Sequence, residues 1–119
     1  MLFVEYPKCS TCQKAKKWLQ ERNVEFEDRH IVEHNPSYEE LKLWYEKSGL
    51  PLKRFFNTSG NKYKELKLKD KLPQMTEEEQ LRLLATDGML VKRPVLVADT
   101  FVTTGFKEKD WMEKLGLEE

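Results

Sequence analysis

The chain has 119 residues, of which 39% are apolar and 35% are charged, and its 21 basic side chains are balanced by 21 acidic ones. This composition predicts one soluble globular domain, and the zero net charge argues against direct binding of nucleic acid or of an anionic membrane. The apolar run of residues 1–4 is too short for a signal-peptide core or a membrane span, so we expect a cytoplasmic protein.

The first third of the chain predicts a β-α-β unit. Residues 2–6 are β-formers that precede a proline, and residues 10–22 have the apolar spacing of a helix that ends at Asn23. Residues 24–32 alternate between apolar and polar types, which predicts a second strand with Val24, Phe26 and Ile31 facing inward. The apolar side of the helix is formed by Ala15, Trp18, Leu19 and the stem of Arg22.

Residues 36–88 have helical rather than strand signals. Ser37 with Glu40 and Thr76 with Glu79 are capping boxes, each followed by an apolar helical stripe. The first of these helices is expected to end at residues 48–49 and the second at residues 87–88. Between them we expect a short helix over 51–56, a loop over 57–61, and helical turns over 63–73 with a solvated lysine face. The segment therefore reads as a helical insert within a single domain.

The strand signal returns after the insert. Residues 93–99 predict a strand that starts at a proline, and residues 100–104 predict a second strand joined to it by a tight turn at Asp99 and Thr100. Gly105 precedes a final helix closed by Gly116. The expected fold class is α/β, with the order β-α-β, helices, β-β-α.

The two cysteines of the chain, Cys9 and Cys12, lie where the first strand turns into the first helix. The positive end of a helix dipole favours a thiolate at Cys9, and Lys8 and Lys14 add positive charge nearby. Cys12, one helical turn later, is placed to attack a mixed disulfide or a sulfenic acid formed on Cys9. Because structural disulfides are rare in the cytosol, this pair predicts a redox function.

Two alternatives to redox chemistry remain at this point. His30 and His34 complete the pattern C-x2-C-x17-H-x3-H, which is close to a zinc-finger signature. However, the cysteines here open a helix and His30 lies in or beside a strand, the reverse of the order in a finger, so we expect no metal. The second alternative is a pair of unreactive thiols.

Four segments together, YPKCSTCQKAKKWL, YKEL, LLATDGMLVKRPVLV and GFKEKDW, resemble the family of glutaredoxin-coupled arsenate reductases and its Spx-type regulator relatives. The resemblance covers essentially the whole chain and implies a thioredoxin-like fold with a helical insert. It implies that Cys9 is the catalytic cysteine and that the bond between Arg93 and Pro94 is cis and faces the cysteine loop. The residues alone favour trans, since only about 5–6% of X-Pro bonds are cis. Arg93 would bind an oxyanion or stabilise the Cys9 thiolate.

The chain departs from the arsenate reductases at several positions. Those enzymes surround their cysteine with three arginines, and only Arg93 has a counterpart here. The other two positions correspond to Asn57, with Arg54 three residues earlier, and to Gly105. Such enzymes also generally lack a cysteine at the place of Cys12. Arsenate reduction is therefore the second alternative function.

The Spx-type regulators do carry a C-x-x-C redox switch and bind the RNA polymerase α-subunit through a surface that includes a glycine, which Gly49 would match. These regulators usually have a longer basic tail, whereas this chain ends at Glu119. We therefore keep redox-sensing regulation as the first alternative function and not as the main expectation.

We expect a thiol-disulfide oxidoreductase with no bound cofactor, in which Cys9 attacks and Cys12 resolves. Its reductant would be glutathione with glutaredoxin, thioredoxin or a small thiol, and its other partner a disulfide substrate. The expected substrate-binding residues are Lys8, Ser10, Thr11 and Arg93, with Pro94 shaping the groove.

Overall fold

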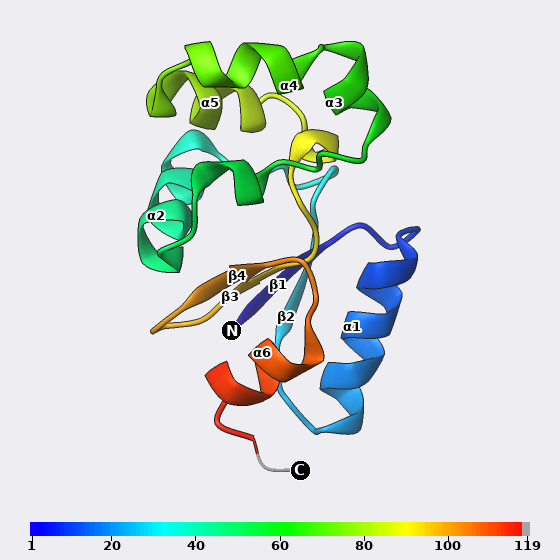
Figure 1. The fold of residues 1–119 in the computed structure, drawn as a ribbon. Coiled ribbons are helices and arrows are strands. Elements are labelled where there is room, and N and C mark those ends of the chain that lie inside the picture. The colour runs from blue at the N-terminus through cyan, green and yellow to red at the C-terminus, as the bar shows by residue number, and fades with distance from the viewer. Residues whose placement is uncertain (118–119) are drawn as a thin grey trace.

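A four-stranded mixed sheet lies at the centre of the molecule in the computed structural model, which describes residues 1–117 (Figure 1). The strands are β1 (Leu2–Glu5), β2 (Glu27–His30), β3 (Val95–Val97) and β4 (Val102–Thr104), in the spatial order β2-β1-β3-β4. β1 runs parallel to β2, with Leu2 opposite Glu27, and antiparallel to β3, with Leu2 opposite Val97; β3 and β4 form an antiparallel hairpin. The predicted α/β class and element order are confirmed.

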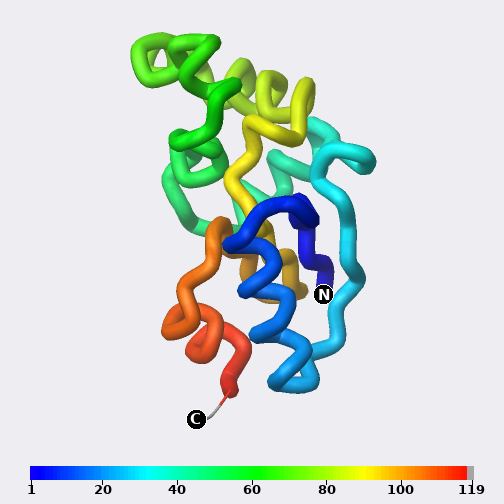
Figure 2. Tube along the Cα trace, turned by 90° about the vertical axis from the view of Figure 1, so that its right-hand side faces the viewer, coloured from blue at the N-terminus to red at the C-terminus, as the bar shows by residue number. Residues whose placement is uncertain are grey.

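Helices cover both faces of this sheet (Figures 1 and 2). One face carries α1 (Ser10–Glu21) and α6 (Glu108–Lys114), and the other carries the helices of the segment between β2 and β3. That segment contains α2 (Tyr38–Ser48), α3 (Asn61–Glu65), α4 (Leu68–Lys71) and α5 (Glu77–Leu84), with short 3-10 turns at Leu52–Phe55, Leu72–Gln74 and Gly88–Leu90. No helix within residues 1–117 is long and apolar enough to cross a membrane.

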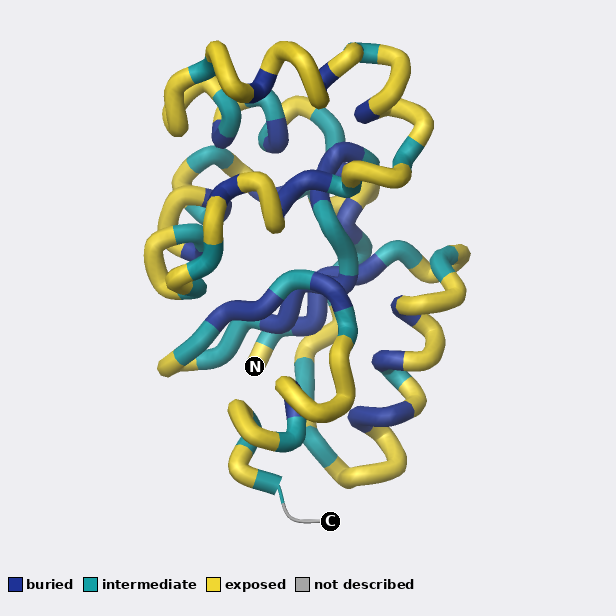
Figure 3. Tube along the Cα trace, in the orientation of Figure 1, coloured by how far each residue is buried: buried dark blue, intermediate teal, exposed yellow. Residues whose placement is uncertain are grey.

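The alternation of side chains along the strands divides the core into two clusters. Phe3 and Leu96 point to the face covered by α1 and α6, where Trp18 and Trp111 pack edge to face at 5.8 Å between ring centroids. Their strand neighbours, Val4 among them, point to the insert, and Figure 3 shows that burial is concentrated in the strands β1, β3 and β4. Both faces of β1 are therefore fully packed, which fixes its position in the middle of the sheet.

Local capping signals correctly predicted the starts of two helices of the insert, α2 and α5. The Ser37 hydroxyl accepts a hydrogen bond from the Glu40 backbone N–H at 3.1 Å, and the Glu40 carboxylate accepts one from the Ser37 N–H at 3.0 Å. Thr76 and Glu79 repeat this reciprocal pair at 3.1 and 2.9 Å. Two orphan N–H groups are satisfied at each helix start, so both predicted capping boxes are confirmed.

The second strand is shorter than predicted. Residues 24–32 were expected to form it, but β2 contains only Glu27–His30, all of them polar. Val24 and Phe26 come before the strand and pack against the α1 and α6 cluster, and Ile31 follows it and is fully buried on the insert side. β2 is an edge strand, and its length is limited by its single partner β1, which has four residues.

The boundaries around the third strand also differ from the prediction. The helix expected to end at residues 87–88 ends at Leu84, and the Asp87 carboxylate caps the following 3-10 turn by accepting from the Met89 N–H at 2.9 Å. The strand expected from residue 93 begins at Val95. The peptide bond between Arg93 and Pro94 is cis, so the trans form favoured by the residues alone is wrong and the form implied by the family resemblance is confirmed.

Candidate active site

An open groove of about 1120 Å³ lies where the cysteine loop, the insert and the segment before β3 meet. Cys9 and Thr11 line it from the start of α1, and Arg93 lines it from the segment before β3. The side chains that reach it from the insert include Arg54 and Asn57. The groove is thus built from three parts of the chain that are distant in sequence.

Cys9 is held at the start of α1 by backbone hydrogen bonds. Its own N–H donates to the Tyr6 carbonyl at 2.9 Å, and its carbonyl accepts from the Gln13 N–H at 3.0 Å. The Gln13 side chain also donates to the Pro7 carbonyl at 2.9 Å, which ties the loop to the helix. Cys9 is half-buried and Cys12 is completely buried, and both are free thiols. Only the first cysteine is thus open to a substrate.

The environment of Cys9 favours its thiolate. Burial is the largest single effect and opposes a charge there. Hydrogen bonds from the backbone and the thiol of Cys12, from the Arg93 side chain and from the backbone of Thr11 together outweigh it, so the pKa of the Cys9 thiol lies below its usual value. Cys9 is the N-cap residue of α1, so its sulfur also lies at the positive end of the helix dipole.

The environment of Cys12 has the opposite effect. The pKa of the Cys12 thiol is raised to about 12, mainly by burial and also by the neighbouring Cys9 sulfur as a charge and as a hydrogen-bond acceptor. The Tyr6 backbone and the Arg93 charge oppose these effects without outweighing them. At neutral pH Cys12 therefore keeps its proton, and Cys9 is the thiol of the pair that ionises more readily.

Arg93 presents hydrogen-bond donors that no protein group uses. Its Nε and Nη1 atoms are buried and have no partner within residues 1–117. The guanidinium carbon lies 5.1 Å from the centroid of the Tyr6 ring, a cation–π distance that helps to fix the side chain. A partly buried guanidinium with unused N–H groups beside a thiolate is suited to bind an anionic or polar ligand atom.

The other predicted site residues are not all gathered in the groove. Pro94 is buried, and its carbonyl accepts from the Gly105 N–H at 2.8 Å, which connects it to the end of β4. Thr11 lines the groove with Cys9 and Arg93. Lys8 and Ser10 are exposed on the same loop, and within the described residues they do not belong to the groove lining.

Sequence reasoning missed most of the cations of the groove. Besides Arg93, five basic residues line it: Lys53, Arg54, Lys62, Lys92 and Lys107. The backbone of Arg54 is fixed by the Thr104 hydroxyl, which donates to its carbonyl at 2.7 Å. These residues come from the insert and from both sides of the hairpin, so no local sequence pattern joins them. The only available signal was the position of Arg54 three residues before Asn57.

The zinc alternative finds no support in the geometry. Within residues 1–117 no three His, Cys, Asp or Glu side chains are grouped as they would be to hold a metal ion. The Nδ1 atom of His30 accepts hydrogen bonds from the Val32 and Glu33 N–H groups, both at 3.1 Å. That histidine nitrogen is therefore already used in the turn after β2.

Comparison with known proteins agrees with the fold and with the resemblance. The chain is 60% identical to the Bacillus subtilis protein YusI over 95% of its own length and 96% of that protein. It is 32% identical to the regulatory protein MgsR of the same organism, over 89% of its own length and 82% of that protein.

Two solved structures are also closely similar. An ArsC family related protein from Bacteroides fragilis has a TM-score of 0.93 and 65% identity, over 96% of this chain and 95% of that one. A possible arsenate reductase from Streptococcus mutans has a TM-score of 0.85 and 45% identity, over 92% and 94%. These likenesses confirm the thioredoxin-like fold of the ArsC proteins. Since the model of the ArsC family matches residues 4–114, the chain belongs to the ArsC family.

Proposed function

We propose that this protein is a thiol-disulfide oxidoreductase that uses Cys9 as the nucleophile and Cys12 as the resolving thiol. The observation that carries the proposal is the difference between the two sulfurs. Cys9 opens into the groove and has a lowered pKa, whereas Cys12 is completely buried and its pKa is raised to about 12. An accessible nucleophile that ionises readily, beside a protonated and buried partner, is the arrangement needed for two-step disulfide reduction.

In the first step the Cys9 thiolate attacks one sulfur of a substrate disulfide. The substrate S–S bond breaks, a mixed disulfide forms on Cys9, and the other substrate sulfur leaves as a thiolate that takes up a proton. Arg93 stabilises the attacking thiolate, and Thr11 lies beside it in the groove. Pro94 shapes the wall, and the exposed Lys8 and Ser10 add contacts at the edge.

The second step depends on the loss of the Cys9 charge. That charge is one cause of the high pKa of Cys12, and Arg93 acts on Cys12 in the opposite direction. Once Cys9 is in a mixed disulfide, its negative charge is gone and Arg93 is left to favour the Cys12 thiolate. Cys12 then loses its proton and attacks the Cys9 sulfur, which releases the second substrate thiolate and leaves an intramolecular disulfide.

The oxidised protein must be returned to the dithiol form by two electrons from an external thiol. We propose glutathione with glutaredoxin, thioredoxin or a small thiol as the donor, acting in the cytoplasm. No bound cofactor is needed, because sulfur carries the electrons throughout.

The test is the rate of alkylation of Cys9 by iodoacetamide across pH, read by mass spectrometry in the full chain. We expect Cys9 to react faster at neutral pH than a model thiol, and Cys12 to stay unlabelled until the protein is unfolded. Cys12→Ser serves as the control that isolates Cys9. If Cys9 reacts no faster than free cysteine at neutral pH, or if a mild oxidant forms no reversible bond between the two sulfurs, the proposal fails.

A second candidate is a redox-sensing regulator that binds the RNA polymerase α-subunit. One support is the 32% identity to MgsR. The other is the exposure of Gly49, which ends α2 with a φ of +67° and where an added Cβ would meet no atom within 4 Å. A pull-down with the polymerase α-subunit, using the reduced and the oxidised chain, tests it. Binding that differs between the two forms supports regulation, and no binding in either form removes it.

Arsenate reduction is the third candidate, supported by the likeness to the possible arsenate reductase from Streptococcus mutans and by the cations of the groove. It requires arsenate-dependent oxidation of an added thiol that is lost in Cys9→Ser. Absence of such oxidation with glutathione and glutaredoxin and with thioredoxin would exclude it.

A further inference from the structure

The groove beside Cys9 has a surplus of positive charge, although the composition of the whole chain is balanced. Six cationic side chains and two carboxylates line it, although the whole chain has 21 residues of each sign. The remainder of the molecule is correspondingly acidic. A hollow lined mainly by one sign of charge concentrates ligands of the opposite sign at its surface.

Most of these cations are available to a ligand. Lys62 is paired with Asp87 at 3.8 Å. Within residues 1–117, no carboxylate is paired with Lys53, Arg54, Lys92, Arg93 or Lys107. Arg93 stabilises Cys9 and still keeps two buried nitrogen atoms, Nε and Nη1, without acceptors. The described part of the groove therefore has unpaired positive charge that is suited to bind a negatively charged ligand.

We infer that the disulfide substrate of this groove is an acidic polypeptide segment, with Asp or Glu residues on both sides of the cysteine that Cys9 attacks. This inference rests on the proposed oxidoreductase function. The proposed function requires a disulfide in the ligand. A nucleic acid contains no disulfide, so it is excluded as the anionic substrate. The carboxylates of the segment would pair with the cations while the cysteine sulfur reaches Cys9.

The placement of the cations favours a polypeptide over a small anion. Lys53 and Arg54 belong to the 3-10 turn Leu52–Phe55, Lys92 and Arg93 to the segment before β3, and Lys107 to the start of α6. The groove volume of about 1120 Å³ is above the usual range of roughly 300–1,000 Å³ for small-molecule sites. A polypeptide with carboxylates on both sides of its cysteine can meet cations on all three elements at once.

Three synthetic peptides of equal length test the inference. Each contains one cysteine as a neutral 2-pyridyl disulfide, flanked on both sides by three Glu, three Gln or three Lys residues. The second-order rate constant with the reduced full chain is followed by release of 2-thiopyridone at low and at high salt. We expect the Glu peptide to react at least tenfold faster than the Lys peptide at low ionic strength, with the difference shrinking towards 1 M salt because screening shortens the range of the charges.

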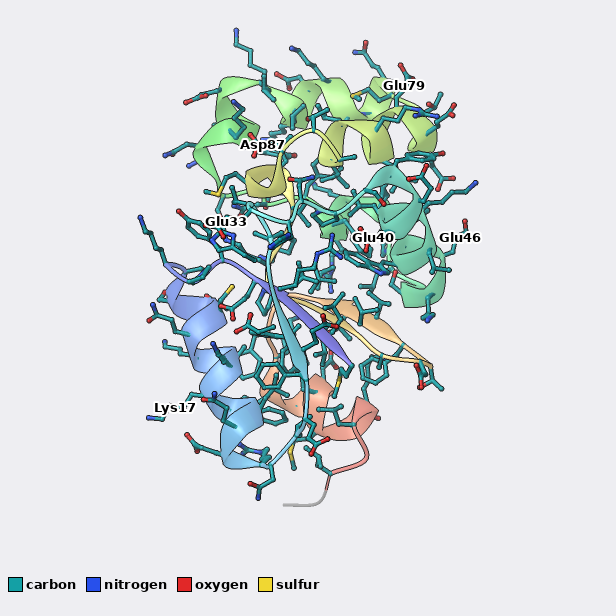
Figure 4. The ribbon with its side chains drawn as sticks, turned by 180° about the vertical axis from the view of Figure 1, so that it is seen from behind. Lys17, Glu33, Glu40, Glu46, Glu79 and Asp87 are labelled. Atoms are coloured by element: carbon teal, nitrogen blue, oxygen red, sulfur yellow. The ribbon has the colours of Figure 1, made fainter. Side chains whose placement is uncertain are left out.

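Charge variants locate the effect. Lys53→Gln and Lys107→Gln are each expected to reduce the Glu-to-Lys rate ratio several-fold. Lys17→Gln is the matched control, since Lys17 is exposed and points outward from α1, away from the groove (Figure 4), and its ratio should equal that of the wild type. Equal losses in all three variants would mean that only net charge matters and would overturn the assignment to the groove.

The remaining outcomes separate this inference from the proposed function. If the Glu and Lys peptides react within twofold of each other while the Gln peptide still reacts faster than with a model thiol, the acidic substrate is wrong and the oxidoreductase stands. If the 2-pyridyl disulfide of glutathione gains as much at low salt as the Glu peptide, the ligand is a small anion and the polypeptide is wrong. If no peptide reacts faster than with a model thiol, the proposed function itself fails.

Discussion

Replacing Glu5 with Gln should make the protein more stable at neutral and alkaline pH. Glu5 ends β1 and is only 2% exposed. The pKa of its carboxyl is raised to about 7 overall, chiefly by burial and also by the hydrogen bond to Asp28 and the charge of Asp28. Lys16, with its Nζ 3.7 Å from Glu5 and 2.6 Å from Asp28, acts in the opposite direction.

The sign of the effect follows from proton binding. Between the usual pKa of 4.5 and about 7, the folded state keeps a proton on Glu5 that the unfolded state has lost. The free energy of unfolding therefore falls as pH rises through this window, by up to about 3 kcal/mol, and stays reduced above it. Asp28 has a lowered pKa, so its contribution changes below pH 4 and does not overlap with that window.

Gln keeps the shape of protonated Glu and can still donate a hydrogen bond to Asp28, but it never ionises. We expect Glu5→Gln to match the wild type near pH 4.5 and to be more stable by up to about 3 kcal/mol at pH 8, or roughly 10 °C in Tm for a chain of this size. The measurement is urea unfolding at half-unit steps from pH 4.5 to pH 8, with Glu25→Gln, at an exposed site, as the control. Parallel curves for Glu5→Gln and the wild type would show that Glu5 ionises normally and would refute the reasoning.

Three further changes test the site and its support. Arg93→Met removes a hydrogen-bond donor from Cys9, so the pKa of Cys9 should rise and its alkylation at pH 7 should slow several-fold; an unchanged pH profile would contradict the role given to Arg93. Cys12→Ser should accumulate a stable mixed disulfide between Cys9 and a substrate, visible as a mass adduct, and rapid turnover without an adduct would show that Cys12 does not resolve. Gly88→Ala places a Cβ 2.1 Å from the Ile31 carbonyl oxygen and should cost about 2 kcal/mol or more in urea unfolding; a wild-type midpoint would mean that the backbone there yields easily.

The fold was predictable from sequence where the signals are local. The Ser37 and Thr76 capping boxes fixed two helix starts because each is a contact between residues three apart. The length of β2 was not predictable, because Val24, Phe26 and Ile31 continue the apolar alternation but are buried by helices beyond the strand itself. Burial alone therefore does not distinguish a strand from the extended chain beside it.

The position of the two cysteines was predictable from the sequence, and the surroundings of the candidate site were not. Cys9 and Cys12 could be placed at a helix start because the spacing and the preceding strand are contiguous in sequence. The cis bond before Pro94 could not be inferred from the residues themselves, since nothing near Arg93 in the sequence indicates it. It followed only from the family resemblance, which carries information about contacts across the whole fold.

The cations of the groove show most clearly what a position-by-position comparison leaves out. Matching the three arginines of arsenate reductases found only Arg93, which suggested a site short of positive charge. The fold instead brings Arg54, Lys53, Lys92 and Lys107 to the same hollow from separate elements. Charges spread in this way raise the local concentration of an extended anion but do not converge on one small oxyanion as a tight ring of donors would. Such a groove should therefore affect which disulfides reach Cys9, and how fast, more than how firmly a single anion is held.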